Sequence, residues 1–434
     1  MKLAKSLALG SAAALVTMTG VANAADLPGA EPVDYVKVCD IKGSTGFFYI
    51  PGTETCLQVG GFARLEMTSG EVLDRPNTVN KRDEFNTTGY RVRARVWFDA
   101  RTDTEYGALR TFIRLQFQKE TGSANTTDRR GRVQNADFGD DALFDQAFVQ
   151  FAGLTAGVTD SFWDFKPYTT FQNPFISDRT LPVLAYTIKA GDFSASVALE
   201  DKTYRYQDTN NSLLNEGQKL PDIVANLRVK QGWGEAQLSG VLHRIDPASA
   251  GRVPALANAD SVWGWGLQGG LKVNLPTANT SDAKGDFVWG NVAYTDGGGV
   301  SYNGFTDNNI GSGQTQNIVN NFQPIFDWLP GAGGKVEKTK TFTANLGVLH
   351  YWSPTWRSSL AVSYAQMKYN NNVALADDWK AGTITGNLIW SPVKKLDIGG
   401  EVVYVKNINK ADIGYTGPRD KDAFIGRLRV QRDF

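Results

Sequence analysis

Apolar and polar side chains alternate along most of this chain, and the segment from Tyr90 to Ala100 shows the pattern most clearly. It reads Tyr-Arg-Val-Arg-Ala-Arg-Val-Trp-Phe-Asp-Ala. Because successive side chains of a strand point to opposite faces, one face of this segment is apolar and the other carries arginine and aspartate. The alternation recurs along the chain, and no complementary apolar layer accompanies the charged face. The pattern is typical of a barrel wall with lipid outside and water inside.

Sixteen alternating segments follow residue 56, and they predict an all-β fold, a sixteen-stranded antiparallel transmembrane β-barrel. Their expected bounds are 57–67, 88–100, 107–118, 142–152, 154–163, 183–190, 193–200, 223–231, 235–244, 262–275, 286–295, 340–352, 357–366, 379–390, 395–405 and 422–434. Long polar connections alternate with compact turns such as Gly191-Asp192, which is the outer-membrane pattern and puts both termini at the short-turn side. A secreted β-sandwich also alternates, but its crossovers do not produce this regularity.

The N-terminal residues predict export. Lys2 and Lys5 precede an apolar run, and Ala22-Asn23-Ala24 supplies the small residues of a cleavage site. We therefore expect a signal peptide at 1–24, a periplasmic segment at 25–56 and the barrel at 57–434. Cys39 and Cys56 would meet an oxidising compartment after export, which predicts a disulfide between them.

Composition excludes several classes of function. The chain has 45 basic and 45 acidic side chains, and removal of Lys2 and Lys5 with the signal peptide leaves 43 basic ones, which argues against nucleic acid as a partner. Two cysteines and two histidines make no convincing zinc site, so we expect neither a metal nor a cofactor. No set of residues has nameable catalytic roles, so we expect no enzyme. The glycines of 264–269 fit GxGxxG, but they lie inside a predicted strand and open no helix, so they predict no dinucleotide site.

Arginines are concentrated on the predicted inner faces of the first three strands and the last one. Closure of the barrel makes these four strands neighbours and places eight arginines on one stretch of wall: Arg64, Arg91, Arg93, Arg95, Arg110, Arg114, Arg427 and Arg429. Rings of charged side chains are how pores sort ions. We therefore expect these arginines to line the channel and its constriction.

The third long connection, about 160–182, differs from the other loops because it holds six aromatic residues and three prolines. We expect this third extracellular loop to fold inward, bury its apolar surface and narrow the pore. Asp160, Asp164 and Asp178 would then face the arginines, and Lys166 lies in the same loop. The alternative is an outer loop packed on its neighbours.

Several motifs resemble those of the alphaproteobacterial outer-membrane porins. They occupy residues 39–40, 48–57, 148–157, 161–165, 350–354 and 426–434. The resemblance spans nearly all of the exported chain. It implies a homotrimer of sixteen-stranded barrels in the lipid of the outer membrane, through which small hydrophilic solutes and ions diffuse passively.

Two other functions remain open on the sequence. One is a substrate-selective channel of the same fold, for a phosphate-like anion or a sugar, in which the aromatic loop guides the solute. The other is a closed structural or adhesive barrel whose long loops bind partners. Conductance in planar bilayers distinguishes these hypotheses, because a closed barrel insulates and the current of a selective channel is blocked by its own solute.

Overall fold

The structure is a computed structural model. It describes residues 38–39, 46–70, 88–120, 139–171, 175–205, 218–247, 259–276, 285–305, 327–331, 334–369, 378–408 and 422–434. The expected signal peptide at 1–24 and much of the expected segment 25–56 lie outside these ranges. Among the described residues, no helix has the length and apolar character needed to cross a membrane.

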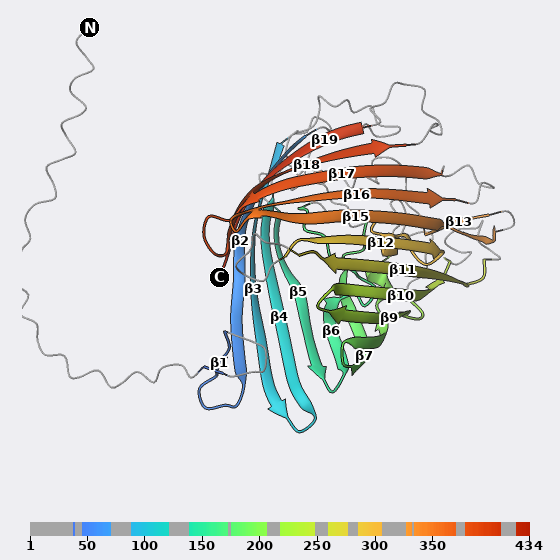
Figure 1. Ribbon diagram of the computed structural model, residues 1–434. Helices are drawn as coiled ribbons and strands as arrows, with labels where there is room; N and C mark the ends of the chain where they lie inside the picture. Colours follow the sequence, from blue (N-terminus) through green and yellow to red (C-terminus); the bar gives the residue numbers. More distant parts are fainter. Residues whose placement is uncertain are drawn as a thin grey trace, which may run out of the picture.

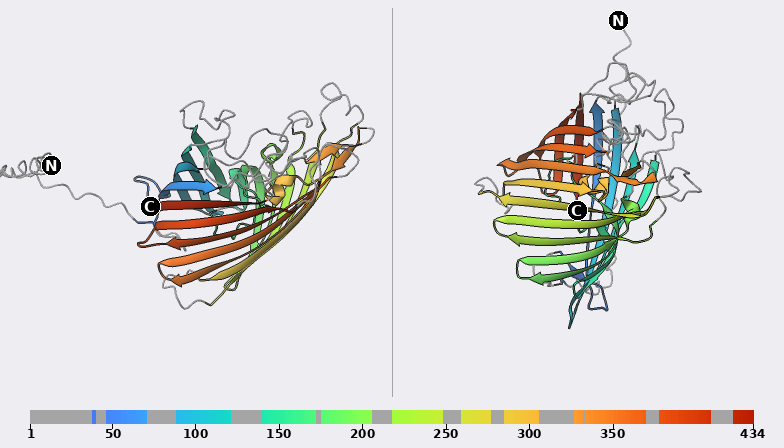
Figure 2. Two further views of the ribbon diagram at one scale, coloured as in Figure 1. Left: turned by 90° about the horizontal axis from the view of Figure 1, so that it is seen from above. Right: turned by 90° about the vertical axis from the view of Figure 1, so that its right-hand side faces the viewer.

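Sixteen antiparallel strands form one closed sheet, which confirms the predicted barrel. The strands are β2 (Cys56–Gly70), β3 (Thr88–Thr104), β4 (Gly107–Glu120), β5 (Gly139–Phe151), β6 (Leu154–Asp160), β7 (Thr180–Ala190), β8 (Phe193–Glu200), β9 (Asp222–Gln231), β10 (Gly234–Ile245), β11 (Val262–Asn274), β12 (Phe287–Asp296), β15 (Lys340–Ser353), β16 (Trp356–Lys368), β17 (Trp379–Trp390), β18 (Leu396–Asn407) and β19 (Asp422–Asp433). Each pairs with the next, so the chain winds once round the wall (Figures 1 and 2).

The last strand closes the barrel against the first. β19 pairs with β2 from Ile425 opposite Gly70 to Asp433 opposite Phe62. The terminal Phe434 adds a hydrogen bond of 3.0 Å from its backbone N–H to the carbonyl of Gly61. In Figure 1 the red β19 meets the blue β2 at this seam. Closure leaves no strand edge unpaired, which a wall surrounded by lipid requires.

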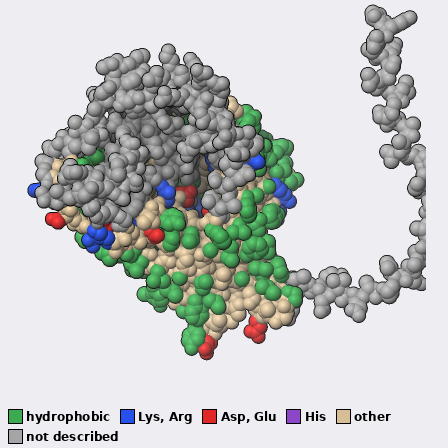
Figure 3. Space-filling model, turned by 180° about the vertical axis from the view of Figure 1, so that it is seen from behind, with side chains coloured by type: hydrophobic (Ala, Val, Ile, Leu, Met, Phe, Trp, Pro, Cys, Tyr) green, Lys and Arg blue, Asp and Glu red, His purple; other side chains and the backbone are tan. Residues whose placement is uncertain are grey.

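The two faces of the wall differ as the alternation predicts. Val92 is 53% exposed and Leu65 is 45% exposed, whereas Glu66 is 1% exposed and Asp99 is 4% exposed. Apolar side chains therefore face outward, and charged and amide side chains face the interior. Figure 3 shows the outward apolar side chains spread over the visible wall. Such a surface is stable only when hydrocarbon or another apolar surface covers it.

Local elements in the connections were not predicted. β1 (Phe48–Tyr49) pairs with the start of β2, and β13 (Trp328–Pro330) pairs with β14 (Val336–Lys338) in the connection between β12 and β15. Two short 3-10 helices, η2 (Lys202–Tyr204) and η4 (Val300–Asn303), follow β8 and β12. These pieces are too short for a period of alternation to reveal them.

The third long connection is shorter than expected, because β6 ends at Asp160 and β7 begins at Thr180. We call its residues 161–179 the L3 segment, of which 161–171 and 175–179 are described. The opposite end of the barrel carries compact turns. The turn between β5 and β6 has φ of 48° at Ala152 and 91° at Gly153. Positive φ at both central residues matches the type I′ hairpin turn, which suits the twist of the strands.

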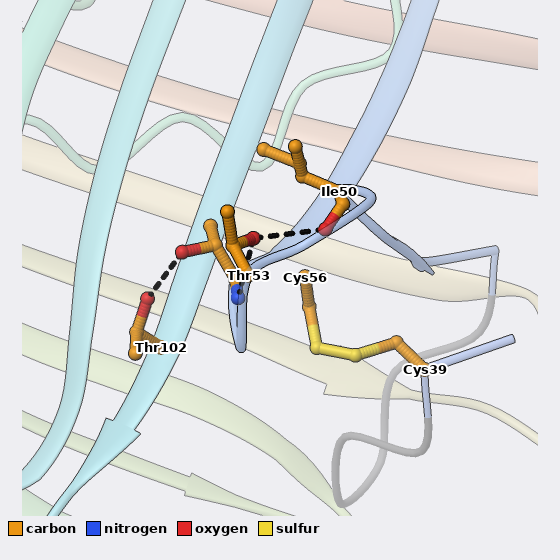
Figure 4. The surroundings of a disulfide bond; sticks show 6 residues. Cys39, Ile50, Thr53, Cys56 and Thr102 are labelled. Atoms are coloured by element: carbon orange, nitrogen blue, oxygen red, sulfur yellow. Dashed lines mark hydrogen bonds between the residues drawn. A yellow bond between two sulfur atoms is a disulfide. The ribbon is translucent and has the colours of Figure 1, made fainter. Parts of the chain in front are cut away.

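The N-terminal disulfide predicted from the sequence is present. Cys39 and Cys56 are bonded, and their Cα atoms lie 5.9 Å apart. Both cysteines are buried together with Phe47 at the start of β2 (Figure 4). Thr55 Oγ1 and Thr102 Oγ1 lie 3.0 Å apart beside them, which links this corner to β3. The bond therefore fixes the described part of the N-terminal segment to the short-turn end of the wall.

Candidate functional site

The predicted arginines share one stretch of the inner wall, because β19, β2, β3 and β4 are consecutive neighbours in the closed sheet. The register brings charges of adjacent strands side by side. Arg64 lies opposite Arg93 on β3, and Arg429 lies opposite Glu66 on β2. Each of these side chains alternates with outward apolar residues. The register thus brings these arginines onto one surface, which we call the arginine wall.

Glutamines hold three arginines of this wall. Arg64 Nε donates to Gln431 Oε1 over 2.7 Å. Arg93 Nη2 donates to Gln118 Oε1 over 2.7 Å, and Arg95 Nε donates to Gln116 Oε1 over 2.6 Å. An amide oxygen fixes a guanidinium without neutralising it. The glutamines therefore fix these guanidiniums in defined positions without neutralising them, although Arg95 also lies near a carboxylate.

Glu66 is the acidic centre of the upper part of the wall, a role that the sequence did not indicate. Its side chain is 2% exposed, and its Oε1 accepts from Arg429 Nη2 at 2.5 Å. Arg91 lies 3.7 Å and Arg427 lies 3.9 Å from the same carboxylate. Three guanidiniums thus surround this carboxylate, and Glu401 lies opposite Arg427 in the register, so three positive charges meet two negative ones in this cluster.

A β-bulge adds a second carboxylate to the wall. The pairing of β4 with β5 shifts at this point, because Arg114 lies opposite Gln146 and Leu115 lies opposite Phe144. The extra residue is Asp145, and its Oδ2 lies 2.5 Å from Arg114 Nε and 3.3 Å from Arg95 Nη2. A bulge re-aims a side chain in this way. A bulge interrupts the alternation of its strand, so the sequence did not predict that Asp145 faces these arginines.

The first part of the L3 segment packs on the inner face of the opposite wall. Trp163 is fully buried and lies in one cluster with small residues of five strands, which are Ala185, Ala198, Val224, Val241 and Ala293. Its Nε1 donates to the carbonyl of Tyr302 in η4 over 2.8 Å. Its own carbonyl accepts from Gln268 Nε2 over 2.6 Å. Small side chains on these strands leave room for the indole.

The second part of the L3 segment reaches the last strands. Asn345 of β15 donates to the carbonyl of Phe175 over 2.9 Å, and Asn387 of β17 donates to that of Thr169 over 3.1 Å. Arg427 Nη1 donates to the carbonyl of Phe171 over 2.9 Å. Ser239 of β10 also donates to the carbonyl of Trp163 over 3.1 Å, so side chains of β10, β11, β15, β17 and β19 all bond to backbone carbonyls of this segment.

The charged residues of the L3 segment pair mainly with one another. Lys166 Nζ lies 2.6 Å from Asp178 Oδ1, 3.4 Å from Asp160 Oδ1 and 4.0 Å from Asp164 Oδ2. Burial opposes the charge of Lys166, but the carboxylates of Asp178, Asp164 and Asp160 raise its pKa above the ordinary value. Asp160 and Asp178 are partly exposed and act electrostatically on Arg95 across the interior. These two acids therefore oppose the arginine wall.

Asp164 does not oppose the arginine wall, contrary to expectation. Its side chain is 1% exposed and lies 3.9 Å from Nη2 of the buried Arg205. Burial raises the pKa of the Asp164 carboxyl to about 8, against the opposing effect of Lys166 and Arg205. A backbone N–H from Arg179 donates to its Oδ2 over 2.8 Å. The alternation that places strand residues does not extend into a loop, so sequence gave no basis for this orientation.

A buried polar cluster behind Trp163 was also missed. Arg205 follows η2, is fully buried, and lies over the ring of Tyr302 at 3.8 Å from its centre. Tyr302 donates from its hydroxyl to Asp222 over 2.7 Å, and Lys202 lies 2.6 Å from Asp246. These contacts hold η2 and η4 inside the long-loop end. These polar residues lie in different connections and strands, so only the folded barrel brings them together.

A cavity of about 320 Å³ lies beneath the far end of the L3 segment. Arg64, Arg429 and Arg357 contribute cations to its lining, and Phe171 and Tyr351 contribute aromatic rings. Arg357 Nη2 lies 2.5 Å from Asp397 and Arg429 Nη2 lies 2.5 Å from Glu66, so two of the three cations are paired with a carboxylate. The residues around this cavity suit an anionic solute. Within the described ranges, no group of three or more metal-ligating side chains occurs.

Comparison with known proteins identifies the family. A family model described as a porin subfamily matches residues 27–424. The chain belongs to this porin subfamily. Porin Omp2b of Brucella suis biovar 1 (strain 1330) is 32% identical to it over 308 residues, which are 67% of this chain and 80% of the relative. Porin Omp2b of Brucella canis is 33% identical over the same extent. The resemblance read from the sequence motifs is thereby confirmed.

A solved structure shares the fold of this porin. The outer membrane channel DcaP of Acinetobacter baumannii aligns with a TM-score of 0.63 over 89% of this chain and 99% of that one. The two sequences are 17% identical in this alignment, so the likeness concerns the fold alone. Membership in a porin family indicates a channel rather than an enzyme.

Proposed function

We propose that this porin forms a water-filled channel in the outer membrane, through which small hydrophilic solutes and ions diffuse passively. The L3 segment is its constriction; it is anchored at Arg427 and Arg429 of the arginine wall and faces the arginines of β3 and β4 across the lumen. The main support is that backbone carbonyls of the L3 segment accept hydrogen bonds from β10, β11, β15, β17 and β19. A segment bound to both sides of the barrel interior narrows the path that water can take.

Charge is arranged asymmetrically across this constriction. Arg64, Arg93 and Arg95 stand on one side, and Asp160 and Asp178 with the Lys166 ammonium stand on the other. Arg179 lies in the same segment and offsets the remaining negative charge of the loop side, whereas the wall side carries several positive charges. We infer that the channel favours anions, because fixed charges in a narrow passage select permeating ions by sign.

The proposal is tested by reversal potentials of single channels in a KCl gradient. Replacing Arg93, Arg95 and Arg114 together with alanine is expected to shift selectivity toward cations. Arg432→Ala is the matched control, because Arg432 points away from the lumen and donates to the carbonyl of Lys394. An unchanged reversal potential in the triple variant contradicts the arginine constriction, and a barrel that does not conduct contradicts the channel itself. Exclusion of graded neutral polymers from the open channel then gives the size of the constriction.

A substrate-selective anion channel of the same fold is the second candidate. The cavity beneath the L3 segment favours it, because arginines and aromatic rings meet there. Of the six aromatic residues of the loop, Trp163, Phe165 and Phe175 are 0–2% exposed and packed away from water, whereas Phe162, Tyr168 and Phe171 are partly buried and can still contact a solute. Saturable block of the current by one class of anion supports the selective channel, and a linear dependence of current on anion concentration supports general diffusion.

Export, location and assembly complete the proposal. We infer that residues 1–24 are cleaved, that residues 25–56 face the periplasm, and that the porin works as a homotrimer. The apolar outer wall offers surface both for lipid and for contact between copies. N-terminal sequencing of the purified protein and its mass in a mild detergent test the cleavage and the trimer separately.

A further inference from the structure

The turn between β5 and β6 is recessed at the short-turn end of the barrel. β4 continues to Gly107, past the pairing of Arg110 with Gln150. On the other side, β7 continues well past Tyr186, the partner of Leu154. The backbone N–H of Thr187 donates to the carbonyl of Gly153 over 2.8 Å, which fixes the turn at this height. A notch therefore lies in the rim between the longer hairpins β3–β4 and β7–β8.

The notch contains a cavity of about 590 Å³, which we call the rim pocket. Three cations line it from the inner face of the wall, which are Arg101, Arg110 and Lys189. Tyr186 and Ile188 line it from the outer face, where both are more than half exposed. The pocket thus joins a basic surface inside the barrel to an apolar surface that faces lipid. Its volume suits a small ligand.

The charge of the rim pocket is positive. Asp99 accepts from Arg101 at 3.1 Å and 2.8 Å, and from Arg110 at 2.9 Å and 3.0 Å. One carboxylate therefore serves two guanidiniums, and Lys189 adds a third cation. An oxyanion bound among these three cations gains charge-assisted hydrogen bonds, which are stronger than neutral ones.

Arg110 is held rigidly in the pocket wall. Its guanidinium lies 5.2 Å and 5.3 Å from the ring centres of Phe112 and Phe148, which are stacked on each other. Its Nη1 also donates to Gln150 over 3.0 Å. A cation that is fixed before the ligand arrives loses little entropy on binding. The pocket is built around this residue.

We propose that the rim pocket binds a phosphate group at Arg101, Arg110 and Lys189. Two sources carry that chemistry to this height of the barrel. One is the head group of an anionic phospholipid in the adjoining leaflet, with its acyl chains over Tyr186 and Ile188. The other is a phosphorylated solute that leaves the constriction along the arginine wall. The solute source rests on the proposed channel function, whereas the lipid source requires only a barrel embedded in a membrane.

Lys189→Gln and Lys189→Glu test the proposal, because Lys189 is exposed at the end of β7 and its replacement leaves the Asp99 pairs intact. Lys394→Gln is the matched control, since Lys394 is an exposed lysine on the turn between β17 and β18. Arg101→Gln is a second, independent variant of the pocket.

Native mass spectrometry of the detergent-purified porin counts retained phosphatidylglycerol against phosphatidylcholine. In bilayers of phosphatidylcholine, pyrophosphate added on the short-turn side is titrated as a blocker of the current.

Loss of one exposed cation is expected to weaken binding roughly twofold to fivefold, and Lys189→Glu is expected to weaken it further. Lower lipid retention with unchanged block identifies the phospholipid as the ligand, and weaker block with unchanged retention identifies the solute. The proposal is overturned if neither measurement changes in the Lys189 and Arg101 variants, or if Lys394→Gln changes them equally. A barrel that fails to conduct contradicts the proposed channel function, and the lipid-retention measurement still tests whether the rim pocket binds a phosphate group.

Discussion

The guanidinium of Arg429, in the last strand, lies over the ring of Phe171, 3.9 Å from its centre. The two residues are far apart in sequence, and only closure of the barrel brings the last strand to the end of the L3 segment. Arg427 Nη1 and the Glu401 carboxylate bond the backbone of Phe171 at the same place. The arginine wall therefore has a mechanical role, because it anchors the L3 segment.

Phe171→Ala is expected to loosen the L3 segment. The change removes a cation–π contact worth about 1 kcal/mol and leaves the backbone hydrogen bonds. Open-channel current noise should rise, with a modest increase in conductance, when single channels are recorded at constant voltage. Phe171→Leu keeps an apolar side chain without the aromatic face, so its current noise should lie between that of the wild type and that of Phe171→Ala. Noise identical to the wild type in both variants would show that this contact does not hold the segment.

Asp145→Asn is expected to raise anion selectivity. The bulge carboxylate lies beside Arg114 and Arg95, so its neutralisation exposes their charge to the lumen. The reversal potential in a salt gradient should move in the direction opposite to that of the triple arginine variant. Asp103→Asn, an exposed aspartate near the end of β3, is the control. Equal shifts in both variants would mean that any carboxylate on this side acts alike, and that the bulge has no special effect.

Thermal stability should depend on pH through Asp164. Its pKa in the folded protein is about 8, above the ordinary 3.8, because the carboxyl is buried. The folded state thus binds this proton more tightly, so its stabilising contribution is fully present below about pH 4 and is lost as pH rises through about 8. Between about pH 6 and pH 9, the Tm of the wild type should fall relative to that of Asp164→Asn. Parallel Tm curves for the two proteins would contradict this assignment.

Removal of the disulfide should weaken the N-terminal attachment and spare conduction. The bond closes a loop of 17 residues in sequence separation, and cross-links of this size stabilise by about 3 kcal/mol. The double variant Cys39→Ser, Cys56→Ser should unfold at a lower temperature and keep the single-channel conductance of the wild type. Reduction of the wild type should reproduce the loss of stability. A Tm unaffected by both treatments would show that pairing of β1 with β2 is sufficient.

The wall of the barrel follows from sequence, because strand alternation is a local property. Lipid outside and water inside impose opposite demands on residues such as Val92 and Arg93, and each strand satisfies them on its own. Sixteen strands, their order and the arginine wall follow directly. The pairing of Cys39 with Cys56 also follows, since these are the two cysteines of the sequence.

The tertiary structure determined where several acidic side chains lie. Asp145 reaches the arginines through a bulge, Asp164 turns toward Arg205, and Glu66 becomes the centre of three guanidiniums. A loop has no period from which side-chain directions can be read, and a bulge interrupts the period of its strand. The rim pocket likewise exists because neighbouring hairpins end at different heights. Such features depend on contacts between residues distant in sequence, and these contacts form only when the barrel has closed.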